Sequence, residues 1–458
     1  MRKIVRGLLE AQRRRSPHPL RFRLRRFRNW FFLGLLYAGY YLCRYNLGIV
    51  APELKHDLGY SNEQYGSISS ARDAGYAVGQ FVNGLFADAL GGKQSMAVGA
   101  LGTIVLNVLF GLTAGSGVGW MLTAFVLIRL LDGYVQAFGA PGMIKVKTAW
   151  FERRERGGFS GVFGGMIQLG QIGAGQLGRL LLVGFTVPVI GEVAGLHWRW
   201  MFFVPPAILF LILLVTWFNV RNHPEEVGYT IAHDDQGDDD WSGKRPPLKH
   251  VFRVVIRNPL AWVNAAAYFC TGFVRRALEA WWVLYLVEVW QAGKTSQYYG
   301  QLVWLLPLSA FLGSLSAGYV SDMVFGGRRS PVAVLLYGIE TVTILGALLV
   351  LGFTSLAGPV VACAFLTMIS FTCNSSHSII GAAVVMDIGG RKMSGFTMGL
   401  IDCFQYLGAI LAGRVLGSLI TSYGWNAFFA AMLPWSALGA TLMLGVWLKT
   451  RGRDVRGG

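Results

Sequence analysis

The stretch GLFADALGGK at residues 84–93 recurs in the second half of the chain as GYVSDMVFGGRR at residues 318–329. Each copy holds a glycine, an aspartate one helical turn later, and a lysine or arginine directly after a pair of glycines. The two copies lie about half the chain length apart, as parallel repeats do in proteins built by internal duplication. The pattern therefore predicts a chain made of two related halves.

The composition of the chain places these halves in a lipid bilayer. Of the 458 residues, 53% are hydrophobic and only 14% are charged, whereas about 25% of the residues of a soluble protein are charged. Apolar runs of roughly 20 residues, the length that crosses the hydrocarbon of a bilayer, recur along nearly the whole chain. We therefore expect an all-α integral membrane protein with twelve transmembrane helices in two pseudo-symmetric six-helix halves.

The order of apolar and polar segments defines the expected organisation. The twelve spans are predicted near residues 29–52, 63–88, 94–113, 119–147, 158–189, 199–220, 259–288, 297–322, 330–352, 358–386, 394–421 and 424–448. They divide the chain into a basic tail (1–28), a first half (29–220), a polar linker (221–257), a second half (258–448) and a C-terminal tail (449–458). Lys and Arg concentrate in the connections on the side of the N-terminus. The positive-inside rule therefore predicts a multi-pass protein with both termini in the cytoplasm, and we expect a bacterial cell membrane.

Several function classes are excluded by composition and motifs. The net charge of +17 comes from Lys and Arg in short segments between apolar runs, which is typical of membrane topology rather than of nucleic-acid binding. The five cysteines lie within apolar spans and form no CxxC pair, so neither a metal site nor a disulfide framework is predicted. No Walker A, HExxH or GxSxG motif occurs in a fitting place, so we expect no enzyme activity.

Two arginines lie deep inside apolar spans. Arg44 occupies the first span, and Arg275 lies at the matching position of the seventh span. A charged side chain at the centre of a bilayer costs at least roughly 2.5–3.5 kcal/mol, so such a residue normally faces a watery cavity or a partner. Two permanently charged guanidinium groups on symmetry-related helices would bind a phosphate or a carboxylate in bidentate fashion. The alternative is that both arginines form structural ion pairs.

Other intramembrane charges have a carboxylate close by in sequence. Arg276 lies three residues before Glu279, and this spacing predicts a structural pair on one helix. Arg129 and Asp132 have the same spacing. Their segment also resembles a span-four arginine motif of proton-coupled facilitators, so both residues are candidates for proton coupling.

The repeated segment resembles the loop signature of the major facilitator superfamily, which lies between spans two and three and again between spans eight and nine. The matching residues are Gly84, Asp88, Lys93, Gly318, Asp322 and Arg328. Glycine at the first position would permit close helix contact. The aspartate would accept from a helix N-terminus or pair with a basic residue and so latch one conformation. An ordinary salt bridge in a loop is the alternative.

Further segments resemble the organophosphate:phosphate antiporter family, which includes the glycerol-3-phosphate and hexose-phosphate transporters. These segments are YYLCR at 40–44, AGYAVGQF at 74–81, RERG at 154–157, HPEEVG at 223–228 and YLG at 406–408. The resemblance implies that Arg44 and Arg275 hold phosphate at the pseudo-two-fold axis. It also implies that rocker-switch alternation of the two halves exchanges an organophosphate for inorganic phosphate.

The chain departs from this family at three cavity positions. Tyr45 and Gln80 stand where the family has lysines, and Gln168 lies at or next to the position of a histidine. The cavity is therefore less positive, although both glutamines can still hydrogen-bond a sugar hydroxyl or a phosphate. The candidate substrate-binding residues are Arg44, Arg275, Tyr41, Tyr45, Tyr76, Gln80, Gln168, Trp281, His377 and Gln405.

The expected function is secondary active transport by a monomer that uses no cofactor. We expect exchange of a small organophosphate, such as a sugar phosphate, glycerol phosphate or phosphoglycerate, for inorganic phosphate. The expected partners are this anion, phosphate and the lipid bilayer. Two alternatives remain open: a membrane sensor of sugar phosphates with the same fold, and a proton-coupled transporter of a carboxylate or other organic anion.

Overall fold

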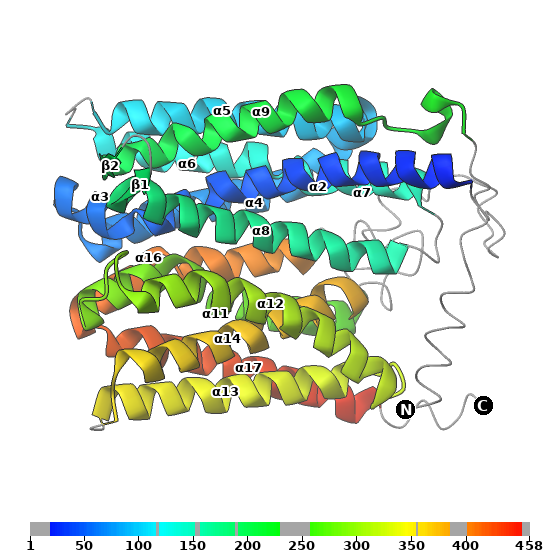
Figure 1. Cartoon of the computed structure of the whole chain (residues 1–458). Helices are drawn as coiled ribbons and strands as arrows, with labels where there is room; N and C mark the ends of the chain where they lie inside the picture. The colour runs from blue at the N-terminus through cyan, green and yellow to red at the C-terminus, as the bar shows by residue number, and fades with distance from the viewer. Residues whose placement is uncertain are drawn as a thin grey trace.

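The chain folds into two bundles of long helices that run along one common direction. The computed structural model describes residues 19–115, 119–151, 156–187, 191–229, 257–353, 356–384 and 401–450. In Figure 1 the helices of the first half lie together above those of the second half. Helix α2 begins and helix α17 ends at the same end of the molecule. We call this the terminus end, where α2 begins, and the opposite end, with α3 and the β-hairpin, the far end.

The first half consists of long helices joined by short connections. Its elements are α2 (Leu20–Ile49), α3 (Ala51–Leu58), α4 (Asn62–Leu90), α5 (Gly92–Thr113), α6 (Met121–Gln136), α7 (Gly139–Trp150), α8 (Arg156–Val183), β1 (Gly184–Val187), β2 (Gly191–Ala194), η1 (Trp198–Phe202), α9 (Val204–Asn219) and η2 (Pro224–Val227). Glycines with positive φ angles separate some neighbouring helices. Gly59 after α3 and Gly91 before α5 have φ angles of 64° and 91°.

The second half has the same style. Its elements are α11 (Pro259–Trp290), α12 (Gln297–Met323), α13 (Arg329–Phe353), α14 (Pro359–Ser378), the π-helical segment η3 (Ile379–Val384), α16 (Arg414–Tyr423) and α17 (Asn426–Thr450). Residues 401–411 are also helical and lead into α16. The turn between α12 and α13 contains Gly326 and Gly327 with φ angles of 60° and 82°, so the repeated glycine pair forms a tight turn here.

The helices of the described residues confirm an all-helical membrane fold. Eight segments are long and apolar enough to cross a membrane: Gly92–Thr113, Met121–Trp150, Trp198–Asn219, Gln297–Met323, Arg329–Gly352, Pro359–Gly381, Ile401–Tyr423 and Asn426–Thr450. The other four predicted spans coincide with α2, α4, α8 and α11, which have 30, 29, 28 and 32 residues. These four helices are long enough to span but carry more polar residues, and they include Arg44, Gln80, Gln168 and Arg275.

Close helix contacts depend on glycine. A methyl group on Gly75 of α4 would lie 1.8 Å from the backbone oxygen of Leu130, and one on Gly133 of α6 would lie 1.9 Å from that of Arg72. In the second half, a methyl group on Gly272 of α11 would lie 2.0 Å from the backbone oxygen of Gln405. Only glycine permits these backbone approaches, which take the place of a hydrophobic driving force between helices in lipid.

The two halves contact each other through charged side chains towards the far end. Lys55 Nζ lies 2.6 Å from Glu288 Oε1. Lys294 pairs with Glu53, also between the halves. The contact continues on other helices, because Arg414 Nη2 of α16 lies 3.1 Å from Glu63 Oε1 of α4. Tyr299 of α12 donates a hydrogen bond of 3.2 Å to the backbone oxygen of Gly175 in α8. The structure therefore has its halves fastened together at this end.

The fifth predicted span, 158–189, is wrong at its C-terminal end. Helix α8 ends at Val183, and the following residues form an antiparallel hairpin in which Gly184 lies opposite Ala194. Gly184 has a φ angle of 89°, which ends the helix. Hydropathy does not detect this boundary because the hairpin begins with the apolar run from Phe185 to Val187.

Some predictions fall on residues that the structure does not describe. These are most of the basic tail (1–18), most of the linker (230–256), residues 385–400 of the predicted spans ten and eleven, and the C-terminal residues 451–458. The side chain of Asp88 and the surroundings of Gly84 also lie outside the described part.

Candidate functional site

Arg44 lies in a buried pocket of aromatic and amide groups in the first half. It is 7% exposed on α2. Its guanidinium carbon lies 4.6 Å from the centre of the Tyr41 ring and 4.5 Å from that of Tyr76. Its Nε donates to Gln136 Oε1 at 2.9 Å. Two cation–π contacts and one hydrogen bond therefore hold the group, and no carboxylate of the described residues pairs with it directly.

A chain of hydrogen bonds connects Arg44 to a buried ion pair on α6. Gln136 donates through Nε2 to Asp132 Oδ1 at 3.0 Å. Asp132 Oδ2 in turn accepts from Arg129 Nη1 at 3.0 Å, so the predicted pair is present. Arg129, Asp132 and Gln136 are each 1% exposed. The negative charge of Asp132 thus acts on Arg44 through one amide, which orients the guanidinium and leaves its Nη atoms available for an anion.

Arg275 lies among polar groups of the second half. Its Nε is 3.1 Å from Glu279 Oε1, one helical turn along α11. With its amide oriented so that the nitrogen donates to Asp402 Oδ1 at 3.0 Å, Gln405 accepts from Arg275 Nη1 at 3.2 Å. The same Gln405 oxygen lies 3.2 Å from His377 Nδ1. Arg275, His377 and Gln405, which were predicted separately, therefore form one cluster.

The histidine of this cluster is held by its neighbours. The Tyr268 hydroxyl lies 2.7 Å from His377 Nδ1, and the two rings stack with centres 5.4 Å apart. Because Nδ1 faces both Tyr268 and Gln405, His377 has defined partners in the structure. It therefore supports the geometry around Arg275.

The two arginines face a shared set of side chains. Tyr41 and Tyr406 lie within electrostatic range of both Arg44 and Arg275. Asp402 is also within range of both arginines. The rings of Tyr76 and Tyr406, one from each half, have centres 4.5 Å apart. The site therefore joins one arginine from each half across an aromatic contact.

Two small cavities lie between the halves, one beside Arg275 and the other beside Glu279. One is lined by Gln168, Gln171, Arg275, Leu278, Glu279, Trp282, Leu306, Ala310, Ser370 and Asn374. The other is bordered by Tyr45, Gln171, Glu279 and Trp282, among others. Each holds about 10 Å³, roughly the room for one water molecule. The Oε1 atom of Gln168 is buried without a hydrogen-bond partner among the described residues. The cavity beside Arg275, which we call the chamber, therefore offers amide and hydroxyl groups next to a guanidinium.

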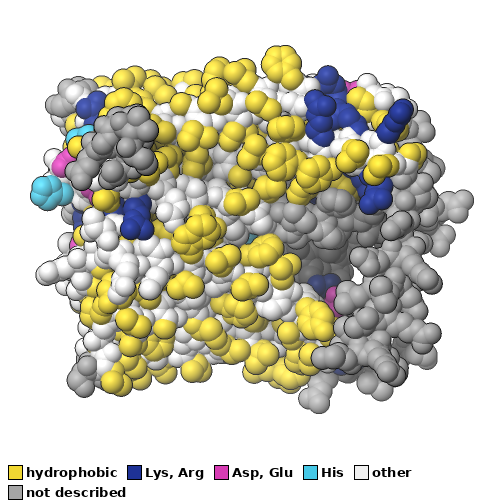
Figure 2. All heavy atoms as spheres, viewed as in Figure 1, with side chains coloured by type: hydrophobic (Ala, Val, Ile, Leu, Met, Phe, Trp, Pro, Cys, Tyr) yellow, Lys and Arg dark blue, Asp and Glu magenta, His cyan; other side chains and the backbone are white. Residues whose placement is uncertain are grey.

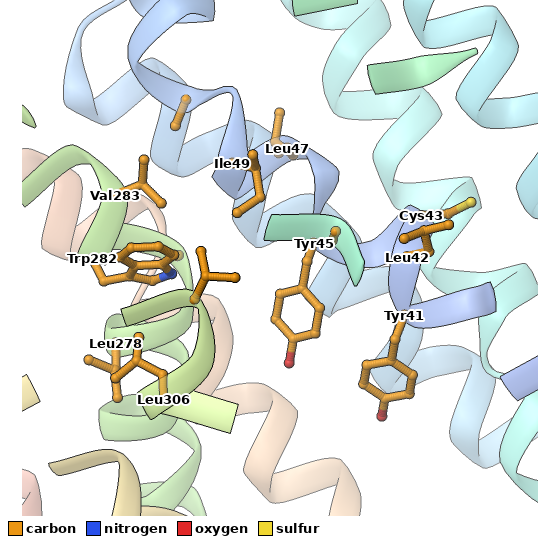
Figure 3. Close-up of a cluster of buried hydrophobic side chains, with 14 of the residues drawn as sticks. Tyr41, Leu42, Cys43, Tyr45, Leu47, Ile49, Leu278, Trp282, Val283 and Leu306 are labelled. Atoms are coloured by element: carbon orange, nitrogen blue, oxygen red, sulfur yellow. The ribbon is translucent and has the colours of Figure 1, made fainter. Parts of the chain in front are cut away.

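Figure 3 places the tyrosines of α2 relative to the second half. Tyr41 and Tyr45 lie one turn apart and project their hydroxyl groups in the same direction. Leu278, Trp282 and Leu306 face them from the other half. Tyr41 therefore belongs to the pocket of Arg44, whereas Tyr45 borders the cavity beside Glu279.

Two predicted site residues lie apart from the arginines' immediate contacts. Trp281 is fully buried, and its Nε1 donates to the backbone oxygen of Ala412 at 2.8 Å. Its ring packs edge-on against Tyr65 at 5.1 Å, so it supports the contact between the halves. Gln80 is half-buried on α4, one turn beyond Tyr76.

The predicted pairing of Arg276 with Glu279 is present, but it is not the closest ion pair of Arg276. Arg276 Nε lies 2.6 Å from Asp73 Oδ2 of α4 and its Nη1 lies 3.7 Å from Glu279 Oε2. Its closer partner is therefore in the opposite half. Glu279 instead approaches Arg275 more closely, at 3.1 Å. Helical spacing permits both pairings of Glu279, and the structure contains both.

The repeated loop motif has different surroundings in its two copies. Lys93 is half-buried, and its Nζ lies 4.3 Å from the centre of the Trp217 ring. Asp322 and Arg328 are exposed. A methyl group on Gly318 would meet no atom of the described chain within 4 Å. Among the described residues, the close helix contact predicted at Gly318 is therefore not seen.

Sequence reasoning missed several residues of the site. Gln136 and Gln171 were not singled out, and Glu279 was assigned only to Arg276. Gln136 lies one turn beyond Asp132, and Gln171 lies one turn beyond Gln168. A search for polar residues at helical spacing from the predicted ones would have found both. Among the described residues, no group of three or more His, Cys, Asp or Glu is arranged to hold a metal ion.

Comparison with known proteins shows which protein family and which individual proteins the chain is similar to. The sequence profile of the Major Facilitator Superfamily matches residues 33–413. The chain is 27% identical over 421 residues to the membrane sensor protein UhpC of Salmonella typhimurium, with 90% of this chain and 89% of that protein covered. It is 27% identical over 443 residues to a probable hexose phosphate transport protein of Chlamydia pneumoniae, with 93% and 92% covered.

A solved structure has the same fold. A bacterial homologue of the human lysosomal transporter Spinster, in an inward-facing and unoccupied conformation, matches with a TM-score of 0.72. It is 15% identical and covers 92% of this chain and 94% of its own. At this identity the match concerns the arrangement of helices alone.

Proposed function

Because the chain belongs to the Major Facilitator Superfamily, we propose that it is a secondary transporter that exchanges a small organophosphate for inorganic phosphate. Members of this family are multi-pass membrane transport proteins rather than enzymes, so the proposal concerns the substrate and the exchange. Two relatives align with about nine-tenths of the chain. One is named a membrane sensor protein and the other a probable hexose phosphate transport protein. The substrate class proposed is a sugar phosphate, glycerol phosphate or phosphoglycerate.

The observation that carries this proposal is the pairing of Arg44 and Arg275 across the halves. Arg44 is buried and Arg275 is half-buried. Both interact electrostatically with Tyr41, Tyr406 and Asp402. A phosphate between two guanidinium groups receives charge-assisted, bidentate hydrogen bonds. The glutamines of the neighbouring chamber would hydrogen-bond hydroxyl groups of the substrate.

The contacts at the far end give a direction to the exchange. Ion pairs such as Lys55 with Glu288 and Arg414 with Glu63 fasten the halves at this end. We therefore expect the substrate to reach the arginines from the terminus end, which we assign to the cytoplasm. Transport to the other side requires that these ion pairs break while the halves close at the terminus end, as alternating access demands.

The experiment is counterflow in proteoliposomes. Vesicles loaded with inorganic phosphate are offered labelled glucose 6-phosphate or glycerol 3-phosphate, with and without a proton gradient. We expect uptake that depends on internal phosphate and is lost in both Arg44→Ala and Arg275→Ala. Arg23→Ala, which removes an exposed arginine near the start of α2, is the control and should retain exchange. Exchange that persists in both site variants contradicts the proposal.

A second candidate function is sensing, because UhpC is named as a membrane sensor and matches along nine-tenths of the chain. A sensor would bind the same anion through the same arginines but would give no counterflow. Binding of labelled sugar phosphate to the purified protein, measured beside counterflow on the same preparation, separates the two. Binding without exchange favours the sensor.

Proton coupling is the third candidate function. It is favoured by the hydrogen-bond network that links Arg44 through Gln136 to Asp132 and Arg129. Asp132 is a buried carboxylate linked through one amide to the arginine proposed to bind substrate. A proton symporter would need the gradient and no phosphate on the opposite side of the membrane. The two vesicle conditions of the counterflow experiment therefore test this alternative directly.

A further inference from the structure

Four basic side chains gather on the first half at the terminus end. They are Arg25 and Arg28 near the start of α2, Lys93 at the start of α5, and Arg221 just after α9. Arg28 is exposed, and the other three are half-buried. Figure 2 shows Lys and Arg side chains clustered at this corner of the molecule. We call these four residues the basic cluster.

Neutral groups bind the arginines of the basic cluster. Arg25 Nη1 donates to the backbone oxygen of Asn219 at 3.0 Å, and Arg28 Nε donates to the side-chain oxygen of the same residue at 2.6 Å. Arg221 Nη1 donates to the backbone oxygens of Phe218 and Val220 at 3.2 and 3.1 Å. These contacts position the guanidinium groups, and among the described residues none of the three arginines forms an ion pair.

The charges of the basic cluster act on one another. Arg25 lies within electrostatic range of both Arg28 and Arg221, and Lys93 lies within range of Arg221. Glu226 is the acidic group that acts on Arg25 and Lys93. Its Oε1 accepts from the backbone nitrogen of His223 at 3.0 Å, and within the described residues it makes no ion pair with the cluster. Like charges held this close favour an anion among them.

Exposed apolar side chains surround the basic cluster. Leu24 is 61% exposed, Phe27 is 57% exposed and Phe218 is 71% exposed. Trp217 is 43% exposed, and its ring also carries the ammonium group of Lys93 at 4.3 Å. Aromatic rings next to basic residues are typical of the depth where hydrocarbon meets lipid headgroups. The apolar groups require acyl chains beside them, and the basic groups require a negative charge at the same level.

We propose that the basic cluster binds the phosphate headgroup of an anionic phospholipid whose acyl chains cover Leu24, Phe27 and Phe218. The phosphate bridges α2, α5 and the end of α9, so it ties the first and last spans of this half together. The apolar surroundings favour a lipid over free phosphate, because free phosphate gains nothing from exposed leucine and phenylalanine. Basic residues near a membrane surface each contribute about 1 kcal/mol to such binding. This proposal is independent of the transported substrate.

The test uses the purified full chain and native mass spectrometry with phosphatidylglycerol as the probe and phosphatidylcholine as the neutral comparison. We expect phosphatidylglycerol to be retained in preference to phosphatidylcholine. The double variant Arg25→Gln/Arg28→Gln should bind phosphatidylglycerol about 30-fold more weakly, the equivalent of two basic residues. A large excess of inorganic phosphate should not displace the lipid. Displacement would show that the cluster is a free-phosphate site and overturn the proposal.

Two further variants separate charge from folding. Arg23→Gln removes one positive charge from an exposed position of α2 outside the basic cluster and should retain wild-type affinity for phosphatidylglycerol. Arg28→Lys keeps the charge but changes the group that bonds Asn219, and should retain most of the affinity. The proposal is overturned if the double variant binds as the wild type does, or if Arg23→Gln loses affinity to the same extent.

Discussion

The Nε atom of Arg276 lies 2.6 Å from Oδ2 of Asp73, so a buried ion pair joins α11 of the second half to α4 of the first. Arg276 also donates to Ser69 Oγ at 3.0 Å, and Asp73 contacts Arg72 on its own helix. One carboxylate therefore contacts two guanidinium groups where the halves meet. Its removal takes the only ion-pair partner that Arg72 has among the described residues and leaves Arg276 with the longer contact to Glu279, away from water.

The first prediction concerns Asp73→Asn. Breaking a buried ion pair from one side costs about 3 kcal/mol or more, since the partner stays buried without a counter-charge. We expect the free energy of unfolding in mild detergent to fall by about this amount. The double variant Asp73→Asn/Arg276→Gln should recover part of the loss. Glu63→Gln, which removes a carboxylate from an exposed pair with Arg414, should change the free energy by less than about 1 kcal/mol. Equal losses in the two single variants would contradict the proposed role.

The second prediction separates Trp281 from the substrate site. Its indole nitrogen bonds Ala412 and its ring is fully buried between the halves. Trp281→Phe should lower the free energy of unfolding by about 1–2 kcal/mol, because one hydrogen bond and some packing are lost. The KM for the transported anion should stay unchanged. Tyr41→Leu, which removes a ring stacked on Arg44, should raise KM. A rise in KM for Trp281→Phe would show that Trp281 is part of the substrate site.

The third prediction tests glycine at a helix crossing. A methyl group on Gly75 would lie 1.8 Å from the backbone oxygen of Leu130, too close for any side-chain adjustment to relieve. Gly75→Ala should therefore abolish the monodisperse peak in size-exclusion chromatography of detergent-solubilised protein. Gly338→Ala and Gly445→Ala, where a methyl group meets no described atom within 4 Å, should elute as the wild type does.

The fold was predictable from sequence because its causes are local or periodic. Apolar runs specify helices that span a bilayer, and the repeated motif at residues 84–93 and 318–329 specifies two halves. The end of α8 was missed, since the φ angle of Gly184 is a backbone property that hydropathy does not measure. Arg44 and Arg275 were identified because a charge inside an apolar span is conspicuous in any sequence.

The partners of these arginines were less predictable. Gln136 lies 92 residues from Arg44, and their contact depends on the rotation of α2 against α6. Glu279 lies three residues from Arg276 and four from Arg275, so helical geometry permits either pairing. Both pairings occur, and the closest partner of Arg276 is Asp73, which belongs to the other half. Contacts between helices therefore decide the site, and no local pattern encodes them.

The fourth prediction concerns Gln136, which accepts from Arg44 and donates to Asp132. Gln136→Met keeps a side chain of similar length but removes both hydrogen bonds. We expect KM for the anion to rise about tenfold, as loss of one hydrogen bond to a charged group predicts. The buried pair of Arg129 and Asp132 remains, so folding should be preserved. Gln94→Met, which removes an amide near the terminus end, should leave KM unchanged. An unchanged KM in Gln136→Met would show that Arg44 needs no positioning by this residue.

The last prediction follows from the position of Glu279 between two arginines. Its carboxylate lies 3.1 Å from Arg275 Nε and 3.7 Å from Arg276 Nη1. An anionic substrate must compete with this carboxylate for Arg275, whereas Arg276 keeps Asp73 as its counter-charge. Glu279→Gln preserves the shape of the side chain but removes the competing charge. KM should therefore fall about tenfold, the effect of one charge-assisted hydrogen bond.

The same substitution should also slow exchange. An anion that Arg275 holds more tightly leaves more slowly, so the maximal rate should fall together with KM. Glu225→Gln is the control, because it removes an exposed carboxylate of η2 near the terminus end. It should leave KM unchanged. Counterflow over a range of substrate concentrations measures both quantities. A higher KM in Glu279→Gln would mean that the carboxylate helps to bind the substrate instead of competing with it.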